Sequence, residues 1–146
     1  MSEDIVIRPL HRDQLAACVD QFITVARDVP GEYWVAKHFL LDLPEKWLLS
    51  LAAWLAEQPI GYAMLSRRSA DTAHLHHFMV AVDQRGRGLG ARLLAAAIER
   101  CRKHHCTEMS LKVDAGNTDA QRFYRQHGFE FTGVDGNYWT MRRRLI

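Results

Sequence analysis

Residues 80–92 read VAVDQRGRGLGAR, which predicts an apolar strand, a basic glycine-rich turn and the first turn of a helix. The start of a helix leaves about four backbone N–H groups without partners and carries partial positive charge. Glycines let an anion approach that backbone closely, and the arginines add positive charge. The segment therefore predicts a strand–turn–helix unit that binds a phosphate or pyrophosphate group.

The sequence after this turn predicts a second strand and a second helix. Apolar residues recur at helical spacing over 89–101, and residues 108–113 have the composition of a strand. The next helix is expected to begin at Asn117, a favourable N-cap, and to end at Gly128, a favourable C-terminal stop.

Two motifs in this region resemble those of the GCN5-related N-acetyltransferase (GNAT) superfamily. The first is Arg85-x-x-Gly88-x-Gly90, which is similar to the superfamily's loop for the pyrophosphate of acetyl-CoA. The second is NxxAxxFYxxxGF, from Asn117 to Phe129. Their order and spacing also resemble those of the superfamily, which makes the pair far more specific than either motif alone.

The resemblance implies a single acetyltransferase domain over residues 1–146 with an α/β fold. Its mixed sheet would be mostly antiparallel, with about seven strands and helices on both faces. The hydrophobic pattern predicts the same order, β-α-α-β-β-β-α-β-α-β-β. The elements expected around the two motifs are strand 5–8, helices 12–27 and 31–41, strand 47–56, turn 57–58, strands 59–66 and 74–80, and a final hairpin of 129–132 with 138–144.

The resemblance also implies which residues hold acetyl-CoA, the acetyl donor. Backbone groups of Phe78, Met79 and Val80 would contact the acetyl oxygen and the pantetheine arm. Asn117 would contact the cofactor arm, and no metal is expected. The residues that would bind the pyrophosphate through backbone N–H groups are Arg85, Gly86, Arg87, Gly88, Leu89, Gly90 and Ala91.

Acetyl transfer to an amine needs a polarised carbonyl, a base for the amine and an acid for the leaving thiolate. By resemblance, Tyr124 would protonate the sulfur. His74 and His76 resemble the paired histidines of serotonin N-acetyltransferase, and strand alternation predicts that they share a face while His77 points to the other. We expect these two to relay the amine's proton, with His76 nearer the acetyl group; the alternative is a structural role.

The acceptor amine is less well defined by the sequence. In the resembled superfamily the first helices and the final hairpin choose the acceptor, and here they combine carboxylates such as Asp28 with aromatic residues such as Trp34. That combination favours a cationic or aryl-alkyl amine. Ribosomal-protein alanine acetyltransferases carry a glutamate where this chain has Lys112, which weakens, without excluding, a protein N-terminus as the acceptor.

Composition argues against several other classes of protein. The net charge of +2 gives no bulk attraction to nucleic acid, and the longest apolar runs fall short of the ~20 residues that span a membrane. Three cysteines without metal-ligand spacing indicate reduced thiols in the cytoplasm. We therefore expect a cytoplasmic enzyme that acts on a small-molecule or peptide amine, without nucleic acid or membrane partners, and a homodimer stays open.

Three alternatives remain at this point. The enzyme could use another acyl-CoA, or the chain could be a catalytically weak CoA-binding regulatory module, although Asn117 and Tyr124 argue against the latter. Residues 86–91 also fit the dinucleotide fingerprint G-x-G-x-x-A, but the acidic residue expected about 20 positions later is missing. No G-K-[ST] follows the turn, which excludes a Walker-type loop.

Overall fold

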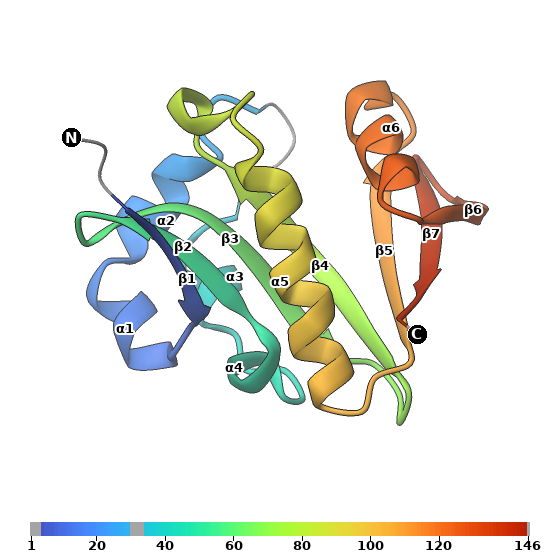
Figure 1. Cartoon of the computed structure of the whole chain (residues 1–146), viewed down its shortest axis with the longest axis horizontal. Helices are drawn as coiled ribbons and strands as arrows, with labels where there is room; N and C mark the ends of the chain where they lie inside the picture. The colour runs from blue at the N-terminus through green and yellow to red at the C-terminus, as the bar shows by residue number, and fades with distance from the viewer. Residues whose placement is uncertain (1–3, 30–33, 146) are drawn as a thin grey trace.

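The computed structural model describes residues 4–29 and 34–145, which form a seven-stranded sheet with helices on both faces (Figure 1). The expected mixed α/β fold is thereby confirmed. The strands lie in the order β1-β2-β3-β4-β5-β7-β6. Their bounds are β1 Ile5–Pro9, β2 Leu51–Leu55, β3 Gln58–Arg67, β4 Thr72–Val80, β5 Glu108–Asp114, β6 Glu130–Asp135 and β7 Tyr138–Arg144.

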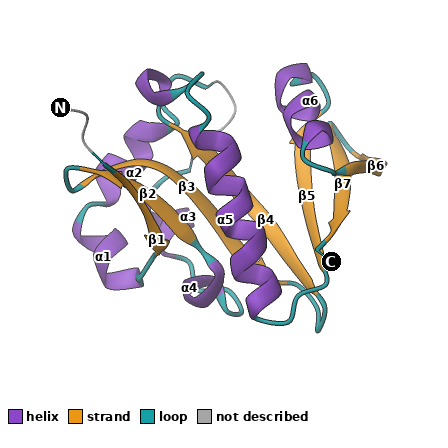
Figure 2. Ribbon diagram, viewed as in Figure 1, coloured by secondary structure: helices purple, strands orange, loops and turns teal. Residues whose placement is uncertain are grey.

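Six helices are described, and Figure 2 shows them together with the strands of the sheet. They are α1 Arg12–Ala17, α2 Val19–Val25, α3 Ala36–Leu40, α4 Lys46–Leu49, α5 Leu89–Lys103 and α6 Thr118–Gln126, with a 3-10 turn at Val82–Gln84. Among the residues described, no helix is long and apolar enough to cross a membrane.

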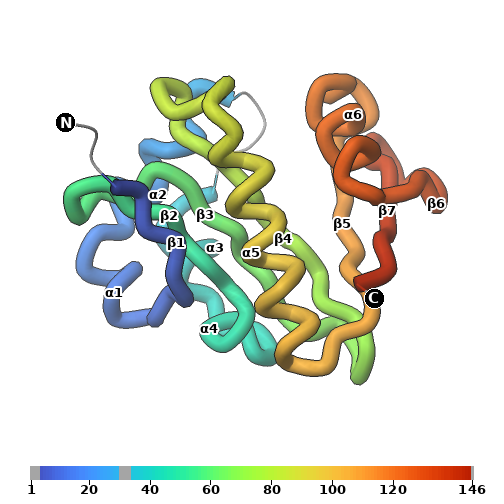
Figure 3. The backbone as a smooth tube through the Cα atoms, viewed as in Figure 1, coloured from blue at the N-terminus to red at the C-terminus, as the bar shows by residue number. Residues whose placement is uncertain are grey.

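The sheet is covered by two apolar cores, one on each face. Helix α5 crosses one face (Figure 3) and buries the apolar side that its sequence predicts, including Leu93, Leu94 and Ile98. Helices α1 to α3 pack on the opposite face of β2 and β3, around Phe22 and Tyr62. The alternation of strand side chains thus supplies apolar residues to both layers.

The sheet is antiparallel except between β4 and β5, which pair in parallel only from Thr72↔Glu108 to Leu75↔Leu111. Beyond that point the two strands separate, as Figure 1 shows. The cause lies in β4, where Leu75 pairs with Leu65 but His77 pairs with Met64. His76 is therefore the extra residue of a β-bulge, and a bulge bends its strand.

Two predicted helices and one predicted strand need correction. The helix expected over 12–27 is two helices, because Cys18 departs from helical geometry with φ −141° and ψ 33°. The helix expected over 31–41 is shorter, because α3 begins after the extended Val35 and ends before the extended Leu41, and residues 31–33 of the prediction lie outside the described ranges. The strand expected over 47–56 begins at Leu51, and the preceding residues form α4.

Lys46 explains why a helix replaces the start of that strand. Its Nζ is buried and donates hydrogen bonds to the carbonyls of His38, Phe39 and Leu41, at 3.2, 2.7 and 2.6 Å. Lys46 thus closes the C-terminal end of α3 while it starts α4. An apolar run such as residues 47–55 fits a buried strand or a buried helix equally well, so its pattern alone could not reveal this.

Smaller shifts affect the turns. The turn expected at residues 57–58 is formed by Ala56 and Glu57, with φ of 49° and 68°, so Gln58 already belongs to β3. The first strand of the final hairpin, expected over 129–132, extends to Asp135. The other expected strands agree with the structure within about two residues, the usual uncertainty of element ends.

Candidate active site

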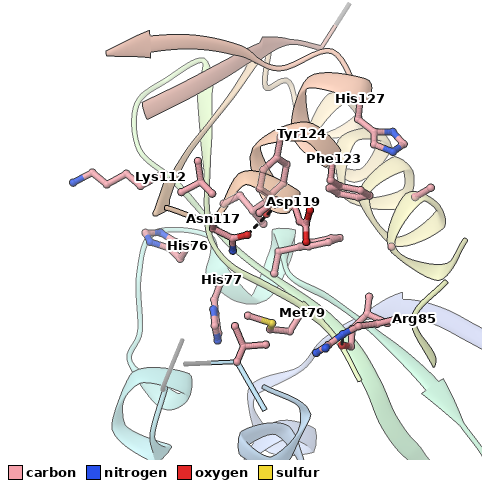
Figure 4. Close-up of a pocket in the computed structure, with 18 of the residues that line it drawn as sticks. His76, His77, Met79, Arg85, Lys112, Asn117, Asp119, Phe123, Tyr124 and His127 are labelled. Carbon is pink, nitrogen blue, oxygen red and sulfur yellow. Dashed lines mark hydrogen bonds between the residues drawn. The ribbon is translucent and has the colours of Figure 1, made fainter. Parts of the chain in front are cut away.

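A cavity of about 710 Å³ opens where β4 and β5 separate (Figure 4). Its walls come from β4, the glycine-rich turn, the start of α5, β5 and α6. The structure brings together these expected site residues in its lining: His76, Phe78, Met79, Val80, Arg85, Gly86, Gly88, Gly90, Ala91, Asn117 and Tyr124. Three expected residues, His74, Arg87 and Leu89, do not line it.

The β4 wall presents backbone groups to the cavity. On one side β4 stays paired with β3 as far as Gly61↔Val80, whereas its pairing with β5 stops at Leu75. In the described part of the chain, the β5-facing edge of residues 76–80 therefore has no neighbouring strand. Backbone N–H and C=O groups on such an edge can bind an extended amide-containing arm as an added strand would.

The glycine-rich turn leads the chain into α5 with unusual backbone angles. Gly86 and Gly88 have φ of 75° and 81°, a region that residues with a side chain rarely adopt. Gly88 is the N-cap of α5, and no side chain caps the helix there. The N–H groups of the first helical turn therefore remain for an anion beside Gly88, Gly90 and Ala91.

The side chains of Arg85 and Leu89 in this turn contact other parts of the protein. The Arg85 guanidinium donates to both Asp28 carboxylate oxygens, at 2.6 and 3.1 Å, and its Nε donates to the Val80 carbonyl at 2.8 Å. This hydrogen-bonded pairing lowers the pKa of Asp28. Leu89 is buried in the core beneath α5, so only its backbone can serve a ligand. Arg85 thus holds the turn against the end of α2.

Helix α6 contributes a polar group and two aromatic rings. Asn117 caps the helix as expected, because its Oδ1 accepts from the Ala120 N–H at 3.1 Å, and its Nδ2 remains as a donor (Figure 4). Phe123 stacks on Phe78 with ring centroids 5.9 Å apart. Tyr124 is mostly buried, meets Phe78 edge to face at 6.3 Å, and faces the cavity.

His74 and His76 lie next to each other at the wall of the cavity, with His76 in the lining and His74 outside it. His74 Nδ1 lies 2.8 Å from Ser110 Oγ, His76 Nε2 lies 2.6 Å from Ser66 Oγ, and the two ring centroids are 4.7 Å apart. Burial, with smaller contributions from His76, Arg68 and Lys112, lowers the pKa of His74 to about 3.

The pKa of His76 is lowered for similar reasons. Burial, followed by the positive charges of Arg68 and Lys46, lowers the pKa of His76 to about 4. Both imidazoles are therefore neutral near pH 7, and a proton that either ring accepts is bound only weakly.

The placement of His77 differs from the alternation that the sequence predicts. The bulge at His76 shifts the phase by one residue, so His77 lies on the same face as His74 instead of the opposite one. The His77 ring stacks on Trp34 with centroids 4.7 Å apart, contacts Tyr62 at 5.2 Å, and lines the cavity. The two-residue periodicity of a strand cannot reveal an inserted residue, so the sequence did not predict this bulge.

The lining also contains residues that were not among the expected site residues, Lys112 and His127 among them. Lys112, on β5, lies near His76 at one end of the cavity, opposite Arg85 and His127 (Figure 4). Its Nζ donates to Asp135 Oδ2 at 2.6 Å. His127, at the end of α6, packs on Phe123 with centroids 4.6 Å apart. His127 occupies an unspecified position of the second motif, and Lys112 was considered only in comparison with a glutamate, so neither was expected in the site.

Two tryptophans, Trp54 and Trp34, lie in different environments. Trp54 is buried in the core, where it meets Phe22 edge to face at 5.7 Å. Trp34 lies beside the cavity through its stack on His77. Within residues 4–29 and 34–145, no three His, Cys, Asp or Glu side chains group as metal ligands would.

Comparison with known proteins identifies similarity over most of the chain. Residues 7–129 match the Acetyltransferase (GNAT) family. The chain is 25% identical to the crystal structure of Ard1 from Thermoplasma volcanium, with a TM-score of 0.82 over 97% of this chain and 98% of that one. The fold and the family motifs therefore agree.

Two curated relatives differ in the acceptor that their names state. The chain is 31% identical over 70 residues to the putative ribosomal protein bS18-alanine N-acetyltransferase of Bacillus subtilis, covering 48% of this chain and 46% of the relative. It is 41% identical over 58 residues to the L-methionine sulfoximine/L-methionine sulfone acetyltransferase of Pseudomonas aeruginosa, covering 40% and 34%. The matches thus span less than half the length of either relative.

Proposed function

Because this chain belongs to the Acetyltransferase (GNAT) family, we propose that it moves the acetyl group of acetyl-CoA directly to a primary amine in a ternary complex. The observation that carries the proposal is one cavity that joins the glycine turn, the unpaired edge of β4, Asn117 and Tyr124. These groups suit, in turn, the pyrophosphate, the pantetheine arm and the thioester sulfur.

The residues proposed to hold acetyl-CoA are those of the β4 edge and the turn, with Asn117 on the cofactor arm. The pyrophosphate would lie on the N–H groups of the first turn of α5, since Gly88 leaves them uncovered by any side chain. Arg85 contributes by fixing the turn through Asp28 and Val80. Arg87, whose side chain lies outside the cavity lining, adds only a screened positive charge.

The proposed chemistry uses a neutral amine as the nucleophile. The incoming ammonium loses one proton by way of His76, which lies in the cavity, contacts Ser66 and passes the proton on toward water. The amine nitrogen then attacks the acetyl carbon, the carbon–sulfur bond breaks, and Tyr124 donates a proton to the departing thiolate. The second proton of the attacking nitrogen returns to the Tyr124 oxygen, so the products are the N-acetyl amine, the CoA thiol and the one proton that His76 has relayed. His74, beside His76 but outside the lining, supports the relay through Ser110.

The acceptor is proposed to be a small-molecule amine in preference to a protein N-terminus. Names among the relatives cover both kinds of acceptor. Lys112 supports the small molecule, because it stands where ribosomal-protein alanine acetyltransferases carry a glutamate.

Cofactor binding is tested by calorimetry with acetyl-CoA on wild type and Gly88→Val. A side chain at Gly88 meets no protein atom within 4 Å, so it would fill the space that the pyrophosphate needs. Gly136→Val is the matched control, since Gly136 also has positive φ and open space but lies in the final hairpin. Equal affinity in wild type and Gly88→Val would contradict the proposed site.

The acid is tested by Tyr124→Phe, which removes one hydroxyl at nearly constant volume. Turnover should fall by about 10²–10⁴-fold, the usual contribution of one positioned acid or base, while acetyl-CoA binds with wild-type affinity. Release of the CoA thiol with a panel of amines measures the rate. An unchanged turnover number would assign Tyr124 to packing alone.

The relay is tested by the rate–pH profiles of His74→Gln, His76→Gln and the double variant. Loss of both rings should lower the rate near neutrality, with partial recovery at high pH where the free amine is abundant. A double variant that keeps the wild-type rate and profile would show that the histidines are structural.

We further propose that residues 1–146 are one acetyltransferase domain acting in the cytoplasm, where its three cysteines, free in the structure, stay reduced. Two alternatives have their own readouts. Transfer from a longer acyl-CoA but not from acetyl-CoA would indicate another acyltransferase. Tight CoA binding without transfer to any amine would indicate a regulatory module. A homodimer is tested by light scattering.

A further inference from the structure

The end of the cavity that lies away from the glycine turn carries a positively charged side chain, Lys112. His76 and Lys112 each follow the last residue pair between β4 and β5, Leu75↔Leu111, so they stand at adjoining positions where the two strands begin to separate. Figure 4 shows both at one end of the cavity, with Arg85 and His127 at the other. Under the proposed function, this end is where the acceptor enters.

The lining offers little to hold an incoming cation. Among the described lining residues, Asp119 is the one carboxylate, and its side chain is 92% exposed and lies 3.6 Å from Arg122. Asp28, whose charge suggests an ammonium partner from sequence, is engaged by both nitrogens of the Arg85 guanidinium. Charge complementarity at this end therefore favours an anionic group on the acceptor.

Lys112 already binds a carboxylate in the structure. Its Nζ lies 2.6 Å from Asp135 Oδ2, and both side chains are well exposed, at 43% and 61%. An exposed pair of this kind is weak and can exchange its carboxylate for another. A second carboxylate that enters from solvent would thus find a donor of the right charge and geometry.

We propose that Lys112 binds a carboxylate of the acceptor, so that the substrate class is the free α-amino acid. The class follows from the two groups that lie at this end of the cavity, His76 for the amine and Lys112 for the carboxylate. An α-amino acid carries both an amine and a carboxylate on one carbon. This inference rests on the proposed acetyl transfer and deepens it.

The test compares acceptors that differ only in this group. The twenty L-amino acids and their C-terminal amides are assayed with acetyl-CoA by thiol release, and kcat/KM is compared within each pair. Wild type should prefer the acid over its amide by about tenfold or more, the contribution of one charge-assisted hydrogen bond. A wild-type enzyme that treats acids and amides alike, or that prefers short peptides, would overturn the inference.

Two variants distinguish a direct contact of Lys112 with the acceptor from a general effect of positive charge. Lys112→Met, which keeps the length without the charge, should reduce the ratio of acid to amide by about tenfold. Arg142→Met is the matched control, because Arg142 shares this face of the sheet and pairs with Glu108 at 3.2 Å but does not line the cavity. An acid-to-amide ratio that falls equally in both variants would overturn the assignment.

Removal of the Asp135 carboxylate, which pairs with Lys112, should change the KM for the acid in the opposite direction. Asp135→Asn removes the competitor for Lys112, so the KM for the acid should decrease while the KM for the amide changes less. An unchanged acid KM would contradict exchange at Lys112. Failure of the proposed function is distinguishable, because it would abolish transfer to acids, amides, amines and peptides alike, and the inference would fall with it.

Discussion

The sharpest prediction concerns the pH dependence of stability that the two neutral histidines impose. Burial lowers the pKa of His74 to about 3 and of His76 to about 4, from 6.5 in an unfolded chain. Between pH 6.5 and pH 4 the unfolded chain therefore binds protons that the folded chain excludes. The free energy of unfolding must decrease as the pH falls through this window.

The size of the effect follows from the same values. For one ring with pKa 6.5 unfolded and about 4 folded, lowering the pH from 7 to 5 removes about 2 kcal/mol of stability. His74 shifts further, but the rings are 4.7 Å apart and depend on one environment. The pair should therefore contribute about 2 to 4 kcal/mol to the loss.

The measurement is urea denaturation at pH 7, 6 and 5 on wild type and on His74→Gln/His76→Gln. Glutamine can still bond Ser110 and Ser66, so the double variant should fold, with a flatter dependence of unfolding free energy on pH. The control is His11→Gln, a change at an exposed histidine that should keep the wild-type slope. Equal slopes in wild type and double variant would refute burial of neutral rings.

Three more predictions follow from single contacts. Asp28→Asn removes the partner of Arg85 and should weaken acetyl-CoA binding by less than about tenfold in calorimetry, since the pair is exposed. Gly128→Ala should destabilise by about 1–3 kcal/mol in thermal melts, because φ is 90° and Arg143 Nε lies 2.8 Å from the added Cβ. Lys46→Met leaves three carbonyls of residues 38–41 without their donor and should cost about 2–4 kcal/mol in urea.

Each of these three has an outcome that would count against its reasoning. Loss of all acetyl-CoA binding in Asp28→Asn would mean that the carboxylate does more than hold Arg85. An unchanged melting temperature in Gly128→Ala would show that Arg143 moves aside at no cost. Wild-type stability in Lys46→Met would show that water replaces the ammonium beside α3.

The sequence by itself determined the elements that rest on local chemistry. The glycine turn, the apolar face of α5 and the N-cap at Asn117 all depend on neighbouring residues along one segment, and the structure places them as expected. The two motifs therefore predicted the fold and most of the cavity lining. Helix periodicity and capping are properties that one segment carries alone.

Only the tertiary structure decided features that join distant segments. The bulge at His76, which sends β4 away from β5, depends on the register with β3 and reverses the face expected for His77. Lys46 closes a helix several residues upstream, and the start of the strand expected over 47–56 belongs to α4 instead. Arg85 became a structural link to Asp28, 57 positions earlier in the chain.

The acceptor end of the site could not be predicted from the sequence for the same physical reason. Lys112 and His76 belong to different strands, and their meeting depends on a parallel pairing that stops after four residue pairs. Local pattern fixes which way a side chain points along its own element, whereas register and strand divergence fix what it meets. The cofactor motif could thus be recognised in the sequence, and the acceptor end required the fold.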